Sequence, residues 1–180
     1  MVTKDFSEFV ARQQVDETDE KVDWAEIRDE WLKNLDSLYK KIAEFLEEYL
    51  VSKSITLGFT DIRLAEENVG EYAAKRMDIK IGRQRVTLEP VGTLLIGSKG
   101  RVDVRGSAGK GLLLLLNEKA KKPADLISLT VIVGKTAPPP KPQKGPISWV
   151  WKIVGAGPQR DFLDLNRDSF LALLMEVTGA

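Results

Sequence analysis

Apolar side chains recur every three or four residues between Asp23 and Leu50. The repeating positions are Trp24, Ile27, Trp31, Leu35, Leu38, Ile42, Phe45 and Tyr49. This spacing predicts an amphipathic helix of about 27 residues, roughly 40 Å long, and Asp23 followed by Glu26 has the spacing of a capping box. A second apolar row widens the stripe, which favours packing across a sheet of the same chain. The alternative is a homodimer whose seam is the helix at residues 23–50.

From Ser54 onward, apolar and polar residues alternate with the period of β-strands. The strand candidates are Ser54–Thr60, Arg76–Gly82, Arg85–Pro90, Thr93–Gly97, Arg101–Gly106, Gly111–Asn117, Ser128–Gly134 and Ser148–Gly155. Several connections are too short for crossover helices, so neighbouring strands should pair as antiparallel hairpins. A closing helix should run between a cap at Asn166 and a stop at Gly179. The sequence therefore predicts an α+β fold: a long amphipathic helix packed on a largely antiparallel sheet of about 6–8 strands.

The first 22 residues lack the regular apolar pattern of the central part of the chain. Phe6, Phe9 and Val10 predict a short N-terminal helix, and the polar residues after it suggest an arm over residues 1–22. Residues 23–180 should then form a single domain, with an exposed Pro-rich loop at residues 135–146.

The sequence shows neither a signal peptide nor an apolar run long enough to span a bilayer, so we expect a cytoplasmic protein with no membrane partner.

Composition narrows the possible chemistry. The chain contains no cysteine and no histidine, which excludes disulfides, thiolate nucleophiles, imidazole bases and the usual zinc sites. Lys plus Arg and Asp plus Glu number 27 each, so net charge gives no support for general polyanion binding. We expect no cofactor, no bound metal and no enzymatic activity.

One catalytic alternative comes from the stretch Gly100–Lys121. Asp103 on one strand, followed 14 and 16 residues later by Asn117 and Lys119 after an aliphatic strand, is similar to the metal-binding arrangement of PD-(D/E)xK nucleases. The likeness covers only about 20 residues, and Asn117 is neutral where a second carboxylate should bind the divalent cation. A hairpin explains the same stretch, so an active or degenerate nuclease-like core is the alternative hypothesis.

Charge is unevenly distributed although the total is zero. Residues Lys75–Gly111 contain nine basic and three acidic side chains, whereas residues Glu17–Glu30 contain seven acidic and two basic ones. Strand alternation places Lys80, Arg85, Arg101 and Arg105 on the solvated face of the sheet. We therefore predict a non-catalytic binding or accessory protein that contacts another macromolecule, most plausibly a protein, through this cationic face.

Two weaker alternatives stay open for the same residues. Nucleic-acid binding without catalysis has less support, because the predicted outer face lacks aromatic side chains on which bases could stack. The charges could also serve only for solubility and weak cross-strand pairing.

Overall fold

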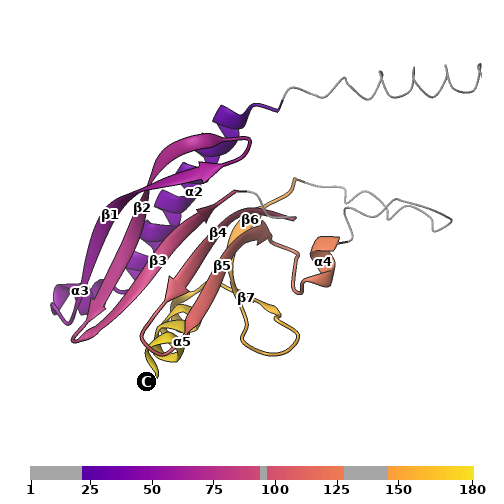
Figure 1. The fold of residues 1–180 in the computed structure, drawn as a ribbon. Helices are drawn as coiled ribbons and strands as arrows, with labels where there is room; N and C mark the ends of the chain where they lie inside the picture. Colours follow the sequence, from indigo (N-terminus) through magenta and orange to yellow (C-terminus); the bar gives the residue numbers. More distant parts are fainter. Residues whose placement is uncertain (1–21, 94–96, 128–145) are drawn as a thin grey trace, which may run out of the picture.

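The computed structural model describes residues 22–93, 97–127 and 146–180 of the 180-residue chain. Within these ranges, seven antiparallel strands form one sheet in which neighbours follow chain order (Figure 1). The strands are β1 (Ile55–Glu66), β2 (Gly70–Ile81), β3 (Gln84–Gly92), β4 (Ser98–Arg105), β5 (Lys110–Asn117), β6 (Trp149–Val154) and β7 (Phe162–Asp164). The helices are α2 (Trp24–Phe45), α3 (Glu47–Val51), α4 (Ala124–Ile127) and α5 (Arg167–Thr178). Helices α2 and α5 share one core with the sheet, which confirms the α+β fold predicted from the sequence.

Several expected elements cannot be compared with the structure. The short helix at Phe6–Val10, the strand Ser128–Gly134 and nearly all of the Pro-rich loop 135–146 lie outside the described residues. The expected strand Thr93–Gly97 is described only at its two ends, which form a bend and a turn. The division into an arm of residues 1–22 and a domain of residues 23–180 therefore stays a prediction.

Helix α2 begins where the sequence predicts but ends earlier. The Oδ1 atom of Asp23 accepts a hydrogen bond from the backbone N–H of Glu26 at 3.0 Å, and so caps the first turn. At Leu46 the backbone leaves the helix, with φ −100° and ψ 3°, and α3 follows as a separate piece. Leu46 is fully buried and Leu50 packs against the same core. The break thus bends the chain while its apolar side stays on the sheet.

Helix α5 has the two ends that the sequence predicts. Asn166 Oδ1 accepts a hydrogen bond from the backbone N–H of Ser169, and the Ser169 hydroxyl accepts one from the backbone N–H of Asn166, which completes a capping box. Gly179 ends the helix with a φ of 76°, in the left-handed region that glycine adopts without strain.

The apolar stripe of α2 is buried against the sheet of its own chain. Trp31, Leu35, Leu38 and Ile42 are each no more than 2% exposed. The ring of Trp31 lies so close to Gly100 of β4 that a Cβ atom there would stand 2.2 Å from the ring. The expectation that the helix packs on a sheet of its own chain is confirmed, and the buried side chains of the stripe are occupied by that contact.

Strands β1 and β2 are longer than the alternation predicts, because the alternation shifts by one residue within them. The pairs Phe59↔Met77 and Ile62↔Ala74 both lie on the helix side of the sheet. Phe59 and Ile62 are three residues apart along β1, and strict alternation would place side chains three residues apart on opposite faces. Two pairs with polar side chains, at Thr60 and Asp61, stand between them. A strict period of two is therefore broken in mid-strand, where the predicted strands ended.

The aliphatic run of β5 contributes to both faces of the sheet. Leu113 and Leu115 belong to the core under the helices, whereas Leu112, Leu114 and Leu116 belong to a second apolar cluster on the opposite face. Side chains from α4 and β7 cover this second cluster. The sheet face that the sequence predicts to be solvated is therefore charged only over β1–β4, whereas over β5–β7 it is apolar and covered.

Candidate functional site: a cationic end of the open sheet face

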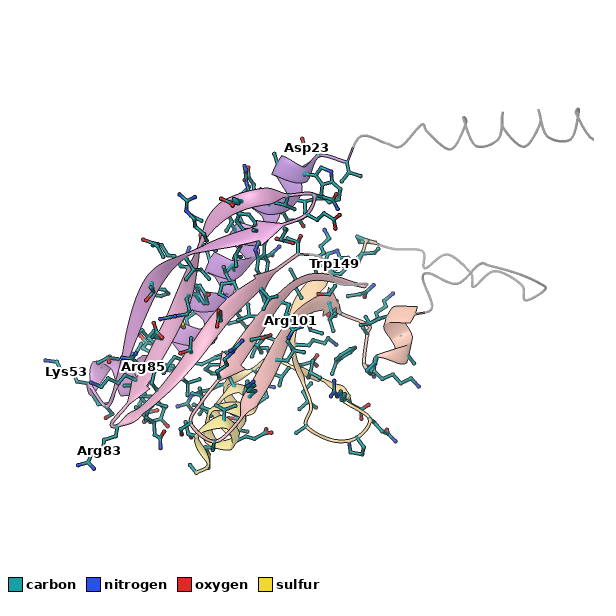
Figure 2. The ribbon with its side chains drawn as sticks, viewed as in Figure 1. Asp23, Lys53, Arg83, Arg85, Arg101 and Trp149 are labelled. Carbon is teal, nitrogen blue, oxygen red and sulfur yellow. The ribbon has the colours of Figure 1, made fainter. Side chains whose placement is uncertain are left out.

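No described helix or strand covers the side of β1–β4 that faces away from α2, and we call this side the open face. At one end of it, basic side chains gather from the α3–β1 turn, the β2–β3 hairpin and the β4–β5 hairpin. We call this group the cationic end; its members are Lys53, Lys80, Arg83, Arg85, Arg105 and Lys110, all exposed. In Figure 2 the labelled Lys53, Arg83 and Arg85 project from the same end of the molecule.

The sheet register sets these cations directly against one another. Lys80 of β2 stands opposite Arg85 of β3, and Arg105 of β4 stands opposite Lys110 of β5. Like charges at directly opposed positions destabilise a sheet, by a fraction of about 1 kcal/mol per pair. Among the described residues, no carboxylate forms an ion pair with Lys80, Arg85 or Lys110. Apart from Arg105, which lies near two acids, the described side chains of the cationic end are thus uncompensated, and the opposed pair Lys80 and Arg85 is expected to lower the stability of the sheet.

Farther along the open face, charges of both signs neutralise one another. Arg101 donates two hydrogen bonds to Asp103, from Nε at 2.7 Å and from Nη2 at 3.2 Å. Arg105 lies more loosely between two acids, 3.8 Å from Glu89 and 3.7 Å from Asp103. The Asp103 side chain is only 19% exposed, so its ion pair with Arg101 lies close against the surface of the sheet. Arg101 is therefore committed within the chain, whereas Arg105 can still turn toward a partner.

A second neutralised group occupies the β1–β2 side of the open face. The carboxylate of Asp78 pairs with Arg76 at 3.2 Å and accepts hydrogen bonds from the hydroxyls of Thr60 and Thr87. These contacts join three neighbouring strands. The positive charge of the open face is consequently concentrated at its cationic end.

The four binding residues predicted from the sequence separate into two kinds. Lys80, Arg85 and Arg105 lie together at the cationic end, and Arg101 lies in the neutralised region. The prediction omitted Arg83, Lys110 and Lys53. Arg83 is one of the nine basic residues counted between Lys75 and Gly111. It lies in a turn, however, and strand alternation does not predict the direction of a side chain in a turn. Only the register shows which cations stand opposite one another.

The nuclease-like residues are not brought together. Asp103 stands on the open face opposite Leu112, whereas Asn117 lies five residues farther along β5, on the alternation that faces the helices. At about 3.3 Å per residue, the two positions are roughly 16 Å apart along the strand. Asn117 Oδ1 accepts a hydrogen bond from the backbone N–H of Lys119, as in a turn. In the part of the chain that the structure describes, no three acidic residues gather to bind a metal.

A buried lysine lies beside a pocket on the far half of the same face. The pocket measures about 340 Å³ and is lined in part by Lys152, which is 2% exposed. The Nζ of Lys152 donates to the backbone oxygens of Glu118 and Ala120, both at 2.8 Å, and pairs with Asp164 at 3.2 Å. An ammonium group has three protons, and all three are engaged. Lys152 therefore fastens the β5–β6 connection and leaves no proton for a ligand.

The tyrosines with strongly shifted pKa values also serve the fold. Burial raises the pKa of Tyr39, and the nearby Asp36 carboxylate adds to the shift. Burial likewise raises the pKa of Tyr72, whose hydroxyl donates to Glu66. The other oxygen of Glu66 accepts from the backbone N–H and the hydroxyl of Thr93, both at 2.8 Å. This network ties the end of the β1–β2 hairpin to the residue that follows β3, at the end of the sheet away from the cationic end.

Comparisons of the chain with protein-family models, with curated proteins and with solved structures found no match. No helix in the described ranges has the length and apolar character needed to cross a membrane. The cationic end must be interpreted from its own geometry and charge.

Proposed function

We propose that the protein is a non-catalytic binding protein whose cationic end engages a carboxylate-rich segment of another protein. The supporting observation is the pair of directly opposed like-charge positions, Lys80 with Arg85 and Arg105 with Lys110. Their repulsion costs stability in the free protein and is relieved when an anionic partner lies between the side chains.

The chemistry of the patch favours carboxylates over a nucleic-acid backbone. Beyond the cationic end, Asp78, Glu89 and Asp103 pair with the arginines of the open face, so this region gives a phosphate chain extended across it little free positive charge. The described open face of β1–β4 also presents no aromatic side chain for base stacking. A short acidic peptide can instead bind at the cationic end without crossing the neutralised region, and the arginine forks can pair with its carboxylates.

The test compares two anionic probes of equal net charge on one protein. Fluorescence anisotropy measures the binding of a labelled oligoglutamate and of a labelled single-stranded oligonucleotide, at low and at moderate salt. We expect tighter binding of oligoglutamate, lost in the double variant Lys80→Glu/Arg85→Glu. This variant keeps a like-charge pair at the same positions, so its stability should stay close to wild type.

Lys40→Glu/Lys41→Glu, on exposed positions of α2, is the matched control, because it changes the net charge equally at another place. It should bind oligoglutamate like the wild type, apart from a small long-range effect. Equal loss in both double variants would show that only net charge matters and would refute the proposed site. Preferential binding of the oligonucleotide would favour nucleic acid as the ligand class.

A further inference from the structure

Helix α2 begins at the end of the molecule opposite the cationic one, and its first turns belong to an acidic stretch of the sequence. Residues Glu17–Glu30 contain seven acidic and two basic side chains. The last four acids of this segment begin at Asp23, which lies at the opposite end of the molecule from Lys53, Arg83 and Arg85 (Figure 2). The protein is thus electrically neutral but polarised from end to end.

Part of this acidic charge is already neutralised in the described chain. Asp29 pairs with Arg28 at 2.9 Å, and Glu30 pairs with Lys99 at 2.9 Å. Residues 17–22, which precede α2, supply three further acids and one base, Lys21. They have the carboxylate-rich composition that the cationic end is proposed to bind.

The acidic residues before α2 cannot reach the cationic end of their own chain. Helix α2 has 22 residues, which at 1.5 Å per residue is about 33 Å, and the cationic end lies beyond its C-terminal end. Glu17 is six residues from Asp23, a span of at most about 20 Å even when fully extended. The cationic end can therefore contact this segment only when a second copy of the chain supplies the segment.

We propose that two copies of this protein associate antiparallel, with the acidic segment Glu17–Glu26 of each placed on the cationic end of the other. Such a pair makes both contacts at once, and the second contact forms within a complex already held by the first. Closed two-fold dimers are accordingly favoured over open chains. This inference rests on the proposed function, because it uses the same cationic end, and it specifies a second copy as the partner.

The experiment follows the mass of the full chain by light scattering after size exclusion, over a range of concentrations. At low salt, about 20 mM, the wild-type mass should rise from 20.1 kDa toward twice that value. At about 300 mM salt it should return to the monomer, because screening weakens contacts between exposed charges.

Charge reversal tests which surfaces are joined. Lys80→Glu/Arg85→Glu lowers the charge of the cationic end from +6 to +2, and Asp19→Lys/Glu20→Lys changes the charge of Glu17–Glu26 from −4 to zero, so each variant should be monomeric at low salt. A chain with all four substitutions has the wild-type net charge but keeps a neutral segment at residues 17–26, so it should also be monomeric. Lys40→Glu/Lys41→Glu should remain dimeric.

Two results would overturn the inference: a wild-type mass of 20.1 kDa at every concentration in low salt, or a wild-type dimer that Lys80→Glu/Arg85→Glu and Asp19→Lys/Glu20→Lys leave intact. If the wild type stays monomeric but still binds oligoglutamate, the dimer is refuted and the proposed function stands. If oligoglutamate also fails to bind, both proposals fail. Circular dichroism spectra of all variants should match the wild type, because Asp19 and Glu20 precede the described fold and Lys80 and Arg85 are exposed.

Discussion

Replacing Arg85 by glutamate should make the protein more stable while it weakens the proposed binding. Arg85 stands directly opposite Lys80, both side chains are exposed, and neither forms an ion pair with a carboxylate among the described residues. Arg85→Glu converts this repulsive pair into an attractive one. If Arg85 had been selected only for stability, reversing its charge would not raise the free energy of unfolding.

The size of the effect follows from the pair geometry. Directly opposed side chains have Cβ atoms about 5 Å apart, so the charged groups lie roughly 6 Å apart. In water, two unit charges at this distance interact with about 0.7 kcal/mol, and screening at about 0.15 M salt roughly halves that energy. Reversing the sign therefore changes the free energy of unfolding by about 0.7 kcal/mol, which corresponds to a rise in Tm of roughly 1.5–3 °C for a chain of this size.

Thermal and urea unfolding of four proteins isolate the pair energy. Wild type, Lys80→Glu, Arg85→Glu and the double variant form a double-mutant cycle, in which both single variants gain stability and the double variant loses the gain. At about 1 M salt the Debye length is near 3 Å, so the differences should largely disappear. An Arg85→Glu variant that is no more stable than wild type, or whose change is insensitive to salt, would refute the argument that repulsion at the cationic end strains the fold.

Three further predictions concern the parts that hold the sheet together. Lys152→Met should lower the free energy of unfolding by about 1–3 kcal/mol in urea titrations, because the buried backbone oxygen of Ala120 loses its donor. Gly100→Ala should destabilise by about 2–3 kcal/mol or more through its clash with Trp31, whereas Gly58→Ala, whose Cβ meets no atom within 4 Å, should stay within about 1 kcal/mol of wild type in thermal scans. The raised pKa values of Tyr39 and Tyr72 stabilise the fold below the unfolded pKa of about 10, and this contribution should be lost progressively as pH rises above it; ultraviolet titration should show both phenols ionising only at or after unfolding.

The elements whose signals are local in sequence could be predicted without the structure. The caps at Asp23 and Asn166 act within one turn, and the stripe of α2 repeats with the helical period, so both helices were found with their starting points. Alternation likewise placed Lys80, Arg85 and Arg105 on one sheet face, because side-chain direction in a strand depends only on position parity.

Features that depend on contacts between distant residues were decided by the tertiary structure. The interruption at Leu46, the shift of alternation near Thr60 and the cover over the even-numbered leucines of β5 all arise where the chain meets elements far away in sequence. The candidate site shows the same limit. Strand alternation indicates which cations point outward. Only the register of the β2–β3 hairpin, however, shows that Lys80 stands opposite Arg85, because register follows from turn geometry and cross-strand packing. The separation of Asp103 from Asn117 has the same origin: residues that are close in sequence lie on opposite faces once the strands pair.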